Sequence, residues 1–301
     1  MIRSLILIAS VGVLGMGLAG CGSAPDSVGA GDQPAASEAA DSAQSSEDLK
    51  IKPVKILALG NSIAFGMNPL VTTPQNPASY KGYPDVLAVP GLINVTNAGC
   101  PGETSGSFLS ASAPDNGCRA WKAAFSLHAD YETTQIAFAT QFIAQNQDTK
   151  FVTIDIGAND LLLVQKGCAT ATDPVACITA ALPGTLTAYG TNLATIFGTL
   201  RAVGFTGKFV ALNLYATNYA DPIVVPAITA LNSVTAGVTA SFNGAVADSF
   251  TGFKLLSQPK NGDVCATGLL IKLPDGTCDI HPSPKGRDVL AALVLAAGVI
   301  K

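Results

Sequence analysis

Four short polar segments of the chain carry groups that nucleophilic catalysis uses. They are Gly60-Asn-Ser62, Pro101-Gly-Glu-Thr-Ser105, Gly157-Ala-Asn-Asp160 and Asp279-Ile-His-Pro282. A serine hydroxyl is a poor nucleophile until a base removes its proton, and His281 is one of only two histidines in the chain. A carboxylate beside an imidazole fixes its tautomer and stabilises the imidazolium ion, and Asp279 stands two residues before His281. The pattern is therefore compatible with Ser62 as a nucleophile and His281 as its base.

The same residues also have a simpler structural interpretation. Ser62 ends an apolar run and opens the next segment, which is the position of a helix N-cap. His281 can be a loop histidine that hydrogen-bonds to backbone, although two prolines stiffen the residues that follow it. The second histidine, His128, lies in a connecting segment without turn or cap signals. These residues alone do not decide between the catalytic and the structural interpretation.

The elements that must position these residues follow an alternating pattern. Short apolar runs, rich in β-branched residues, predict strands covered on both faces at Val54–Leu59, Ile93–Asn97, Phe151–Ile156, Lys208–Leu214 and Phe253–Leu256. Helical spacing of apolar residues occupies Tyr131–Asn146, Leu186–Val203, Ile223–Asp248 and Pro284–Ile300. Strands that alternate with helices predict a three-layer α/β/α sandwich around a five-stranded parallel sheet.

The four polar segments come after the first, second, third and fifth predicted strands. Ligands of open α/β sheets bind at the carboxyl ends of the strands, above all where the strand order reverses. A flavodoxin-like order 2-1-3-4-5 places the first three segments beside that reversal. We therefore expect the four segments to meet at one edge of the sheet.

The bulk composition excludes several classes of function. The chain has 301 residues, of which 48% are hydrophobic and 13% charged, so a large core is expected and global disorder is excluded. The formal net charge is −4, and no basic cluster is present, so nucleic acid is not an expected partner. No phosphate-binding or dinucleotide-binding glycine motif follows a strand, and we expect neither a cofactor nor a metal.

The four segments, in this order, resemble the blocks of the SGNH hydrolases, also called the GDSL esterase/lipase family, across residues 54–300. The resemblance implies that Ser62 is the nucleophile and His281 the general base. It also implies an oxyanion hole formed by the backbone N–H groups of Ser62 and Gly102 and the side-chain amide of Asn159. The activity that it implies is hydrolysis of a small-molecule or lipid acyl ester. A carbohydrate O-deacetylase with the same site, or a non-catalytic surface-binding lipoprotein on the same scaffold, are the alternatives.

Two positions depart from the family pattern. Asn61 stands where the family motif has Asp, a position that normally supports the loop. The family usually places its catalytic Asp three residues before the histidine, and here that position is Cys278. We therefore predict that Asp279 orients His281, with a backbone carbonyl as the alternative. The apolar run Leu161–Val164 can line an acyl pocket, but it is interpreted first as the buried face of a helix.

The N-terminal segment has the pattern of an export signal. Arg3 is followed by an apolar run from Leu5 to Leu18, which is short for a membrane span and weakened by three glycines. Leu18-Ala-Gly-Cys21 resembles the lipobox of bacterial lipoproteins, so residues 1–20 are predicted to be a signal peptide and Cys21 to be lipidated. Residues 21–51 read as a disordered acidic tether rich in Ala and Ser, and residues 52–301 as the hydrolase domain. The protein is thus expected on the outer face of a bacterial cytoplasmic membrane.

Six cysteines remain besides Cys21, an even number that favours disulfides in an exported protein. Their order along the chain suggests the local pairs Cys100–Cys118, Cys168–Cys177 and Cys265–Cys278. A zinc site is the alternative, but no C-x-x-C motif occurs and only two histidines are available. The first and third pairs would staple the loops that carry Gly102 and His281, each by about 3 kcal/mol in the chain-entropy model.

Overall fold

A computed structural model describes residues 52–299 of the chain. The predicted signal peptide, the lipidation site at Cys21 and the predicted tether lie outside the described residues.

The centre of the folded unit is a five-stranded sheet in which every neighbouring pair of strands is parallel. The strands are β1 (Val54–Gly60), β2 (Ile93–Asn97), β3 (Thr149–Asp155), β4 (Lys208–Leu212) and β5 (Ala245–Ala247). Their order in the sheet is β2-β1-β3-β4-β5. This confirms the predicted fold class and strand order, with β1 beside the point where the order reverses.

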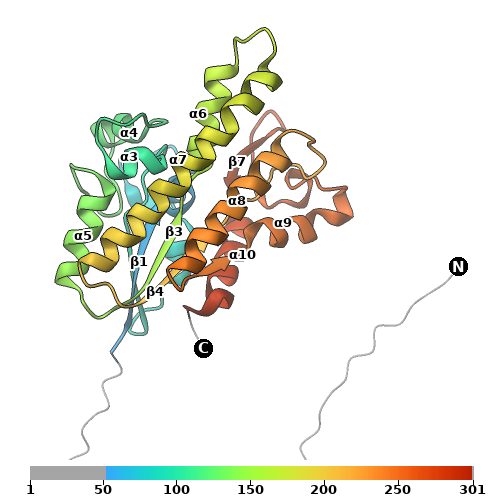
Figure 1. Ribbon diagram of the computed structural model, residues 1–301. Helices are drawn as coiled ribbons and strands as arrows, with labels where there is room; N and C mark the ends of the chain where they lie inside the picture. The colour runs from blue at the N-terminus through green and yellow to red at the C-terminus, as the bar shows by residue number, and fades with distance from the viewer. Residues whose placement is uncertain (1–51, 300–301) are drawn as a thin grey trace, which may run out of the picture. The chain divides into compact units, whose positions relative to one another are not determined.

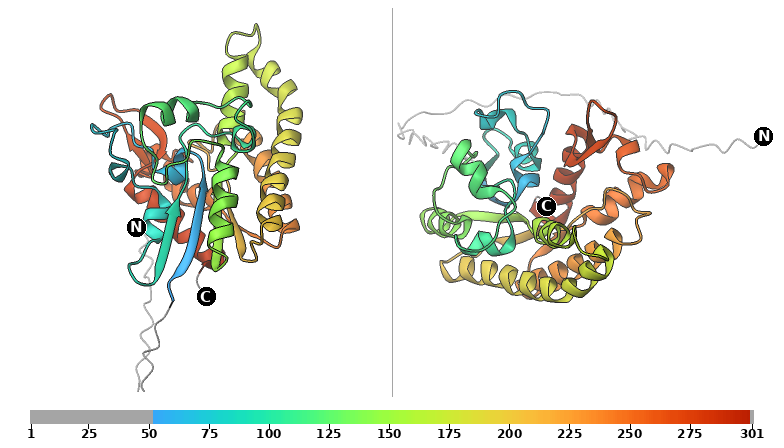
Figure 2. Two further views of the ribbon diagram at one scale, coloured as in Figure 1. Left: turned by 90° about the vertical axis from the view of Figure 1, so that its left-hand side faces the viewer. Right: turned by 90° about the horizontal axis from the view of Figure 1, so that it is seen from above.

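Successive side chains of a strand point to opposite faces of the sheet. Because apolar side chains are buried on both faces, helices cover both of them. Leu57 and Leu59 belong to one buried cluster and Ile56 to another. The first cluster is covered by α5 (Gln135–Gln145), α7 (Pro174–Ala202) and α8 (Val224–Ser241). The second is covered by α2 (Tyr83–Leu87), α9 (Ser249–Ser257) and α10 (Pro284–Val294). The three layers can be followed in Figures 1 and 2.

Four further helices follow the strands at their carboxyl ends. They are α1 (Ser62–Phe65), α3 (Ser105–Leu109), α4 (Cys118–Ala124) and α6 (Ala158–Cys168). Helices α6 and α7 form a hairpin that projects beyond this edge of the sheet (Figure 1). Among the described residues, α8 is the one helix long and apolar enough to cross a membrane by length and composition. It packs against α7, β4 and β5.

The predicted fifth strand is wrong. Phe253–Leu256 lies in α9, where Phe253 is fully buried while Leu255 and Leu256 are 56% and 45% exposed. One-sided burial of consecutive apolar residues is typical of a helix on the surface of a core. The true fifth strand, β5, has only three residues and lies inside the predicted helix Ile223–Asp248, which actually ends as α8 at Ser241.

A second, two-stranded sheet was not predicted. Strands β6 (Leu270–Lys272) and β7 (Cys278–Pro282) pair antiparallel. His281 therefore lies within a strand of this hairpin, and the prediction that its segment lies at the carboxyl end of the fifth parallel strand is wrong. The C-terminal helix α10 begins at Pro284 as predicted, ends at Val294 and continues as a π-helical segment, Leu295–Val299.

Candidate active site

The turn after β1 places the hydroxyl group of Ser62. Strand β1 ends at Gly60, and Ser62 is the first residue of α1. The N-cap of this helix is Asn61, whose side-chain oxygen accepts a hydrogen bond from the Ile63 N–H at 2.9 Å. The interpretation of Ser62 as the cap is therefore wrong. Asn supplies the same acceptor oxygen as Asp would at this position, which explains why the departure from the family motif leaves the turn intact.

Ser62, His281 and Asp279 lie in a hydrogen-bonded row. The Nε2 atom of His281 lies 2.8 Å from Ser62 Oγ, although the two residues are 219 positions apart in the sequence. The other ring nitrogen, Nδ1, is hydrogen-bonded to Asp279 Oδ1. The hydrogen bond from His281 lowers the pKa of the Asp279 carboxyl group below its usual range, so this side chain is a carboxylate at neutral pH.

The hairpin that carries His281 is fixed at several points. The disulfide Cys265–Cys278 ties the start of β7 to the preceding 3₁₀ turn. The hydroxyl group of Tyr215 donates a hydrogen bond to the Ile280 carbonyl oxygen at 2.7 Å. The Tyr215 ring in turn stacks on Phe253 with ring centroids 4.4 Å apart. Tyr215 thus connects the residue between Asp279 and His281 to the main core.

Gly102 lies in the loop after β2, in a conformation that only glycine adopts easily. Its φ is +85°, and a Cβ atom there would lie 2.5 Å from the Asn116 carbonyl oxygen. The Gly102 carbonyl oxygen accepts a hydrogen bond from the Asn116 N–H at 2.8 Å. Within residues 52–299, neither the Ser62 N–H nor the Gly102 N–H donates to another protein group, so both donors remain available for a ligand.

Asn159 is the second residue of α6, and its amide orientation is set by two neighbours. Its Nδ2 donates to the Glu103 carbonyl oxygen at 2.9 Å, and its Oδ1 accepts from Asn116 Nδ2 at 3.0 Å. Because an amide nitrogen carries two hydrogens, one N–H of Asn159 remains for a ligand. No sequence pattern indicated a role for Asn116. Its partner Asn159 is 43 residues away in the sequence, and its other partner, Gly102, lies on the opposite side of the loop.

Gln135, the first residue of α5, connects the Ser62 turn with the Gly102 loop. Its Oε1 accepts from the Gly60 N–H at 2.6 Å, and its Nε2 lies 2.9 Å from the Gly60 carbonyl oxygen. The same Nε2 lies 3.2 Å from Glu103 Oε2. Gln135 is completely buried. It is a positioning residue that the sequence did not indicate.

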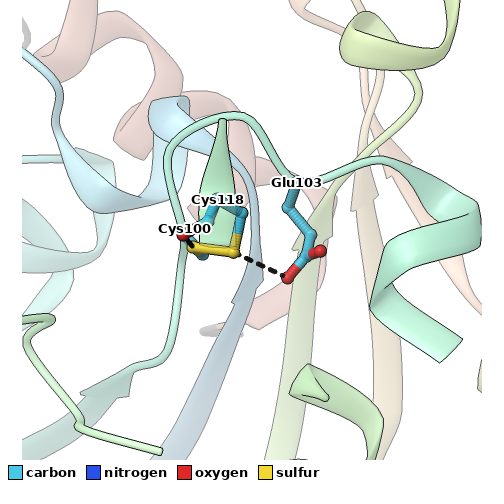
Figure 3. Close-up of side chains that lie close together, drawn as sticks. All are labelled: Cys100, Glu103 and Cys118. Atoms are coloured by element: carbon cyan, nitrogen blue, oxygen red, sulfur yellow. Dashed lines mark hydrogen bonds between the residues drawn. A yellow bond between two sulfur atoms is a disulfide. The ribbon is translucent and has the colours of Figure 1, made fainter. Parts of the chain in front are cut away.

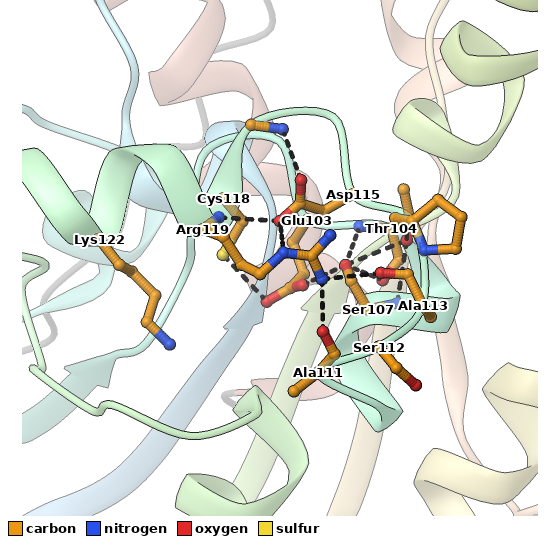
Figure 4. Close-up of polar contacts among 12 residues, drawn as sticks. Glu103, Thr104, Ser107, Ala111, Ser112, Ala113, Asp115, Cys118, Arg119 and Lys122 are labelled. Atoms are coloured by element: carbon orange, nitrogen blue, oxygen red, sulfur yellow. Dashed lines mark hydrogen bonds and ion pairs between the residues drawn. The ribbon is translucent and has the colours of Figure 1, made fainter.

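The loop between Gly102 and α4 is held by a dense set of polar contacts (Figure 4). Arg119 donates to the carbonyl oxygens of Ala111 and Ala113 at 2.7 and 2.8 Å and pairs with Asp115 at 3.3 Å. In the same loop, the Glu103 carboxyl group accepts a hydrogen bond from the Ser107 hydroxyl group. Burial raises the pKa of Glu103 to about 7, against the opposing effect of its hydrogen bonds from Ser107 and Gln135.

All three suggested disulfides, Cys100–Cys118, Cys168–Cys177 and Cys265–Cys278, are present in the structure. Glu103 lies beside the first of them, with Oε2 3.5 Å from Cys118 Sγ (Figure 3). Cys100, Cys118 and Glu103 have the residue types and spacing of a metal site. The two sulfur atoms are bonded to each other, however, so they do not offer the thiolates that a metal ion binds.

An apolar groove begins at Ser62 and runs along the projecting hairpin. Its volume is about 370 Å³, and Ser62 and Asn159 both line it. The remaining wall comes mainly from aliphatic side chains of α6, α7 and α8, among them Leu161, Leu162, Ile178, Leu182, Val224 and Ile228. Leu161–Val164 is thus more than the buried face of a helix, because three of its residues line the groove.

His128 is not part of this site. Its Nε2 lies 2.9 Å from the Phe65 carbonyl oxygen, and its ring packs against the Phe65 ring with centroids 5.0 Å apart. It therefore holds the end of α1 and leaves His281 as the base candidate.

Comparison with known proteins identifies the family of the chain. The model of the GDSL-like lipase/acylhydrolase family matches residues 58–289. The lipase Lip_vut3 from a goat rumen metagenome has a similar structure, with a TM-score of 0.53 and 16% identity over 81% of this chain and 97% of that chain. The search of curated proteins finds no match.

Two further solved structures share the fold. The acetylxylan esterase Axe2 from Geobacillus stearothermophilus superimposes with a TM-score of 0.51 and 20% identity, covering 84% of this chain and 98% of that chain. The enzyme LAE5 from the metagenome of Lake Arreo has a TM-score of 0.51 and 18% identity over 82% and 95% of the two chains. With four sequence blocks that meet at one edge of the sheet and a family match over most of the described residues, the chain belongs to the GDSL-like lipase/acylhydrolase (SGNH hydrolase) family and is a carboxylic ester hydrolase.

Proposed function

We propose that this protein is an exported serine esterase that cleaves acyl esters through an acyl-enzyme intermediate on Ser62. The observation that carries this proposal is the 2.8 Å contact between Ser62 Oγ and His281 Nε2. A serine hydroxyl in direct contact with a carboxylate-oriented imidazole is the arrangement of an activated nucleophile.

In the first half-reaction, His281 Nε2 takes the proton of the Ser62 hydroxyl group while Oγ attacks the ester carbonyl carbon. Asp279 accepts a hydrogen bond from the Nδ1–H of His281 and stabilises the imidazolium ion. The negative charge on the tetrahedral oxygen is met by the N–H groups of Ser62, Gly102 and Asn159, each worth roughly 3–4 kcal/mol in a comparable enzyme. When the intermediate collapses, His281 donates its proton to the leaving alcohol, and the acyl group remains on Ser62.

In the second half-reaction, His281 removes a proton from a water molecule that attacks the acyl-enzyme. The same donors stabilise the second tetrahedral intermediate, and its collapse returns the proton to Ser62 and releases the carboxylic acid. Every step uses groups of this chain and of water, so the proposed mechanism requires no cofactor.

The lining of the groove supports an ester with an aliphatic acyl chain rather than an acetylated carbohydrate. Sugars are bound by polar groups and aromatic platforms, whereas this groove is walled mainly by aliphatic side chains. Axe2 shares the fold and acts on acetylxylan by its name, but fold alone does not determine the substrate.

Export and lipid anchoring rest on residues 1–21, as the sequence predicts. The three disulfides support an oxidising compartment, where such bonds form and persist. We propose that the enzyme is held on the outer face of a bacterial cytoplasmic membrane through Cys21.

The test is hydrolysis of p-nitrophenyl butyrate by the purified wild-type protein and by Ser62→Ala. We expect kcat to fall by about 10³-fold or more in the variant, because the nucleophile is lost while the oxyanion donors remain. Ser112→Ala, in an exposed part of the Gly102 loop, is the control and should hydrolyse the ester at the wild-type rate.

Full activity in Ser62→Ala would contradict the proposed nucleophile. A wild-type protein that binds esters but turns over none would instead support the non-catalytic lipoprotein.

A further inference from the structure

The groove beside Ser62 has a direction and an end. Helix α6 begins at the candidate oxyanion residue Asn159 and runs outward into the projecting hairpin (Figure 1). Six residues of α6 line the groove. Four of them, Ala158, Leu161, Leu162 and Gln165, follow the i, i+3, i+4, i+7 spacing of one helix face, and Asn159 and Val164 lie beside them in the sequence. The groove therefore extends outward along this face, away from the candidate nucleophile.

The opposite wall comes from α7, which runs back antiparallel to α6. The disulfide Cys168–Cys177 ties the last residue of α6 to the first turn of α7. Ile178 is therefore level with the outer end of α6, and Leu182 lies one helical turn, about 6 Å, closer to the sheet. Both side chains line the groove and are half-buried.

We propose that this groove binds the acyl chain of the substrate and limits it to medium length, with Leu182 and Ile178 setting the limit. The proposal rests on the proposed serine esterase function, because it places the ester carbonyl at Ser62. The rise along α6 from Asn159 to Gln165 is about 9 Å. A C–C bond is about 1.5 Å long, so a zigzag chain advances about 1.3 Å per carbon and this length holds roughly seven carbons.

The chemistry of the wall selects an aliphatic occupant. Along its length the groove offers mainly branched aliphatic side chains. Of its polar residues, Asn61, Ser62 and Asn159 lie where the ester group would lie, and Tyr215 and Thr217 also line it. Gln165, which is exposed, is the polar residue at the outer end of α6. An octanoyl chain fits this distribution, whereas a much longer chain would extend past Gln165 into solvent.

The first test compares kcat/KM for p-nitrophenyl acetate, octanoate and palmitate. Burial of one methylene group strengthens binding by up to about fourfold. We therefore expect kcat/KM for octanoate to exceed that for acetate by about tenfold or more, and kcat/KM for palmitate to be no higher than that for octanoate. In Leu182→Trp the indole fills the groove one turn from its end, and the octanoate-to-acetate ratio should fall at least about tenfold. Ile178→Trp, at the end of the groove, should lower the ratio less.

Ala180→Trp is the matched control. Ala180 is exposed and lies between Ile178 and Leu182 in the sequence, but it does not line the groove. This variant adds the same indole to the same helix, so the chain-length profile should stay that of the wild type. Equal rates for acetate and octanoate in the wild type, or an unchanged ratio in Leu182→Trp, would overturn the proposal.

A binding measurement separates the failure of this inference from the failure of the proposed esterase function. Octanoate is titrated calorimetrically into Ser62→Ala, which cannot form an acyl-enzyme, with acetate for comparison. The groove is supported if octanoate binds to Ser62→Ala and to Ser62→Ala/Ala180→Trp but not to Ser62→Ala/Leu182→Trp. This outcome supports the groove even if no ester is turned over. Absence of octanoate binding in a protein that hydrolyses esters would contradict the groove and leave the esterase function standing.

Discussion

The carboxylate of Asp279 is hydrogen-bonded to two groups of His281, its backbone N–H and its ring. Asp279 Oδ1 accepts a hydrogen bond from the backbone N–H of His281 at 2.9 Å and is also bonded to Nδ1 of the ring. An aspartate that bonds the backbone two residues ahead forms an Asx-turn. This local turn explains how an acid two residues before the histidine can do what the family usually does from three residues before it.

Asp279→Asn therefore tests the third member of the site. An amide in place of the carboxylate cannot favour the same tautomer or stabilise the imidazolium ion, so we expect kcat to fall by about 10³–10⁴-fold with little change in KM. Asp288→Asn, an exposed residue of the following helix, is the control. A nearly unchanged kcat in Asp279→Asn would mean that a backbone carbonyl orients His281.

The loop between Cys100 and Cys118 is the element that unites the donors of the site. It carries Gly102, it is closed by a disulfide, and its Asn116 contacts both Gly102 and Asn159. Its buried carboxyl group, Glu103, faces Gln135 from α5. A single element thus connects the backbone donor of Gly102 to the amide of Asn159 and, through Gln135, to the turn of Ser62.

Glu103 should make stability depend on pH. Its pKa is about 7 in the folded protein, against 4.5 for the ordinary side chain. Between these values the folded protein binds more protons than the unfolded chain, so the free energy of unfolding falls as pH rises. Above pH 7 Glu103 lowers the free energy of unfolding by about 3 kcal/mol, and below about pH 4.5 this loss is absent.

Glu103→Gln, which imitates the protonated acid, should remove this contribution. We expect urea unfolding at pH 5 and pH 8 to show a smaller loss of stability in Glu103→Gln than in the wild type. Glu132→Gln, at an exposed position, should keep the wild-type loss. Identical losses in all three proteins would show that Glu103 does not bind a proton on folding.

At the scale of the whole molecule, the parallel sheet brings the site together. Ser62 and Gly102 follow adjacent strands β1 and β2, and Asn159 follows β3 on the other side of β1. The carboxyl ends of parallel strands meet at one edge, so three sequence-distant loops converge there. His281 reaches the same edge from the β6–β7 hairpin, outside the main sheet.

The predicted lipid anchor also belongs to this scale. If Cys21 is lipidated, the full-length protein expressed in a bacterial host should enter the detergent phase of a Triton X-114 extract, because buried acyl chains bind a micelle or bilayer through their methylene groups. Cys21→Ser should move it to the aqueous phase while its esterase activity is retained. A wild-type protein found in the aqueous phase would contradict the anchor.

Much of the architecture was predictable because its causes are local. The apolar runs at Val54–Leu59 and Ile93–Asn97 are strands covered on both faces. The position of the polar blocks, directly after these strands, can be read from the order of residues along the chain. The disulfide pairs were predictable from proximity along the chain. The fifth strand was missed because β5 has three residues, too few for a pattern, while Phe253–Leu256 has the composition of a strand and the burial of a helix.

The sequence by itself determined the fold class and the family and predicted the five site residues, because each depends on residue types in a fixed order along the chain. Only the tertiary structure decided which groups meet. The contacts of Asn116 and Gln135, the approach of His281 to Ser62 and the groove along α6 all depend on residues from separate elements. Such contacts form after the elements have packed, so no local pattern in the sequence records them.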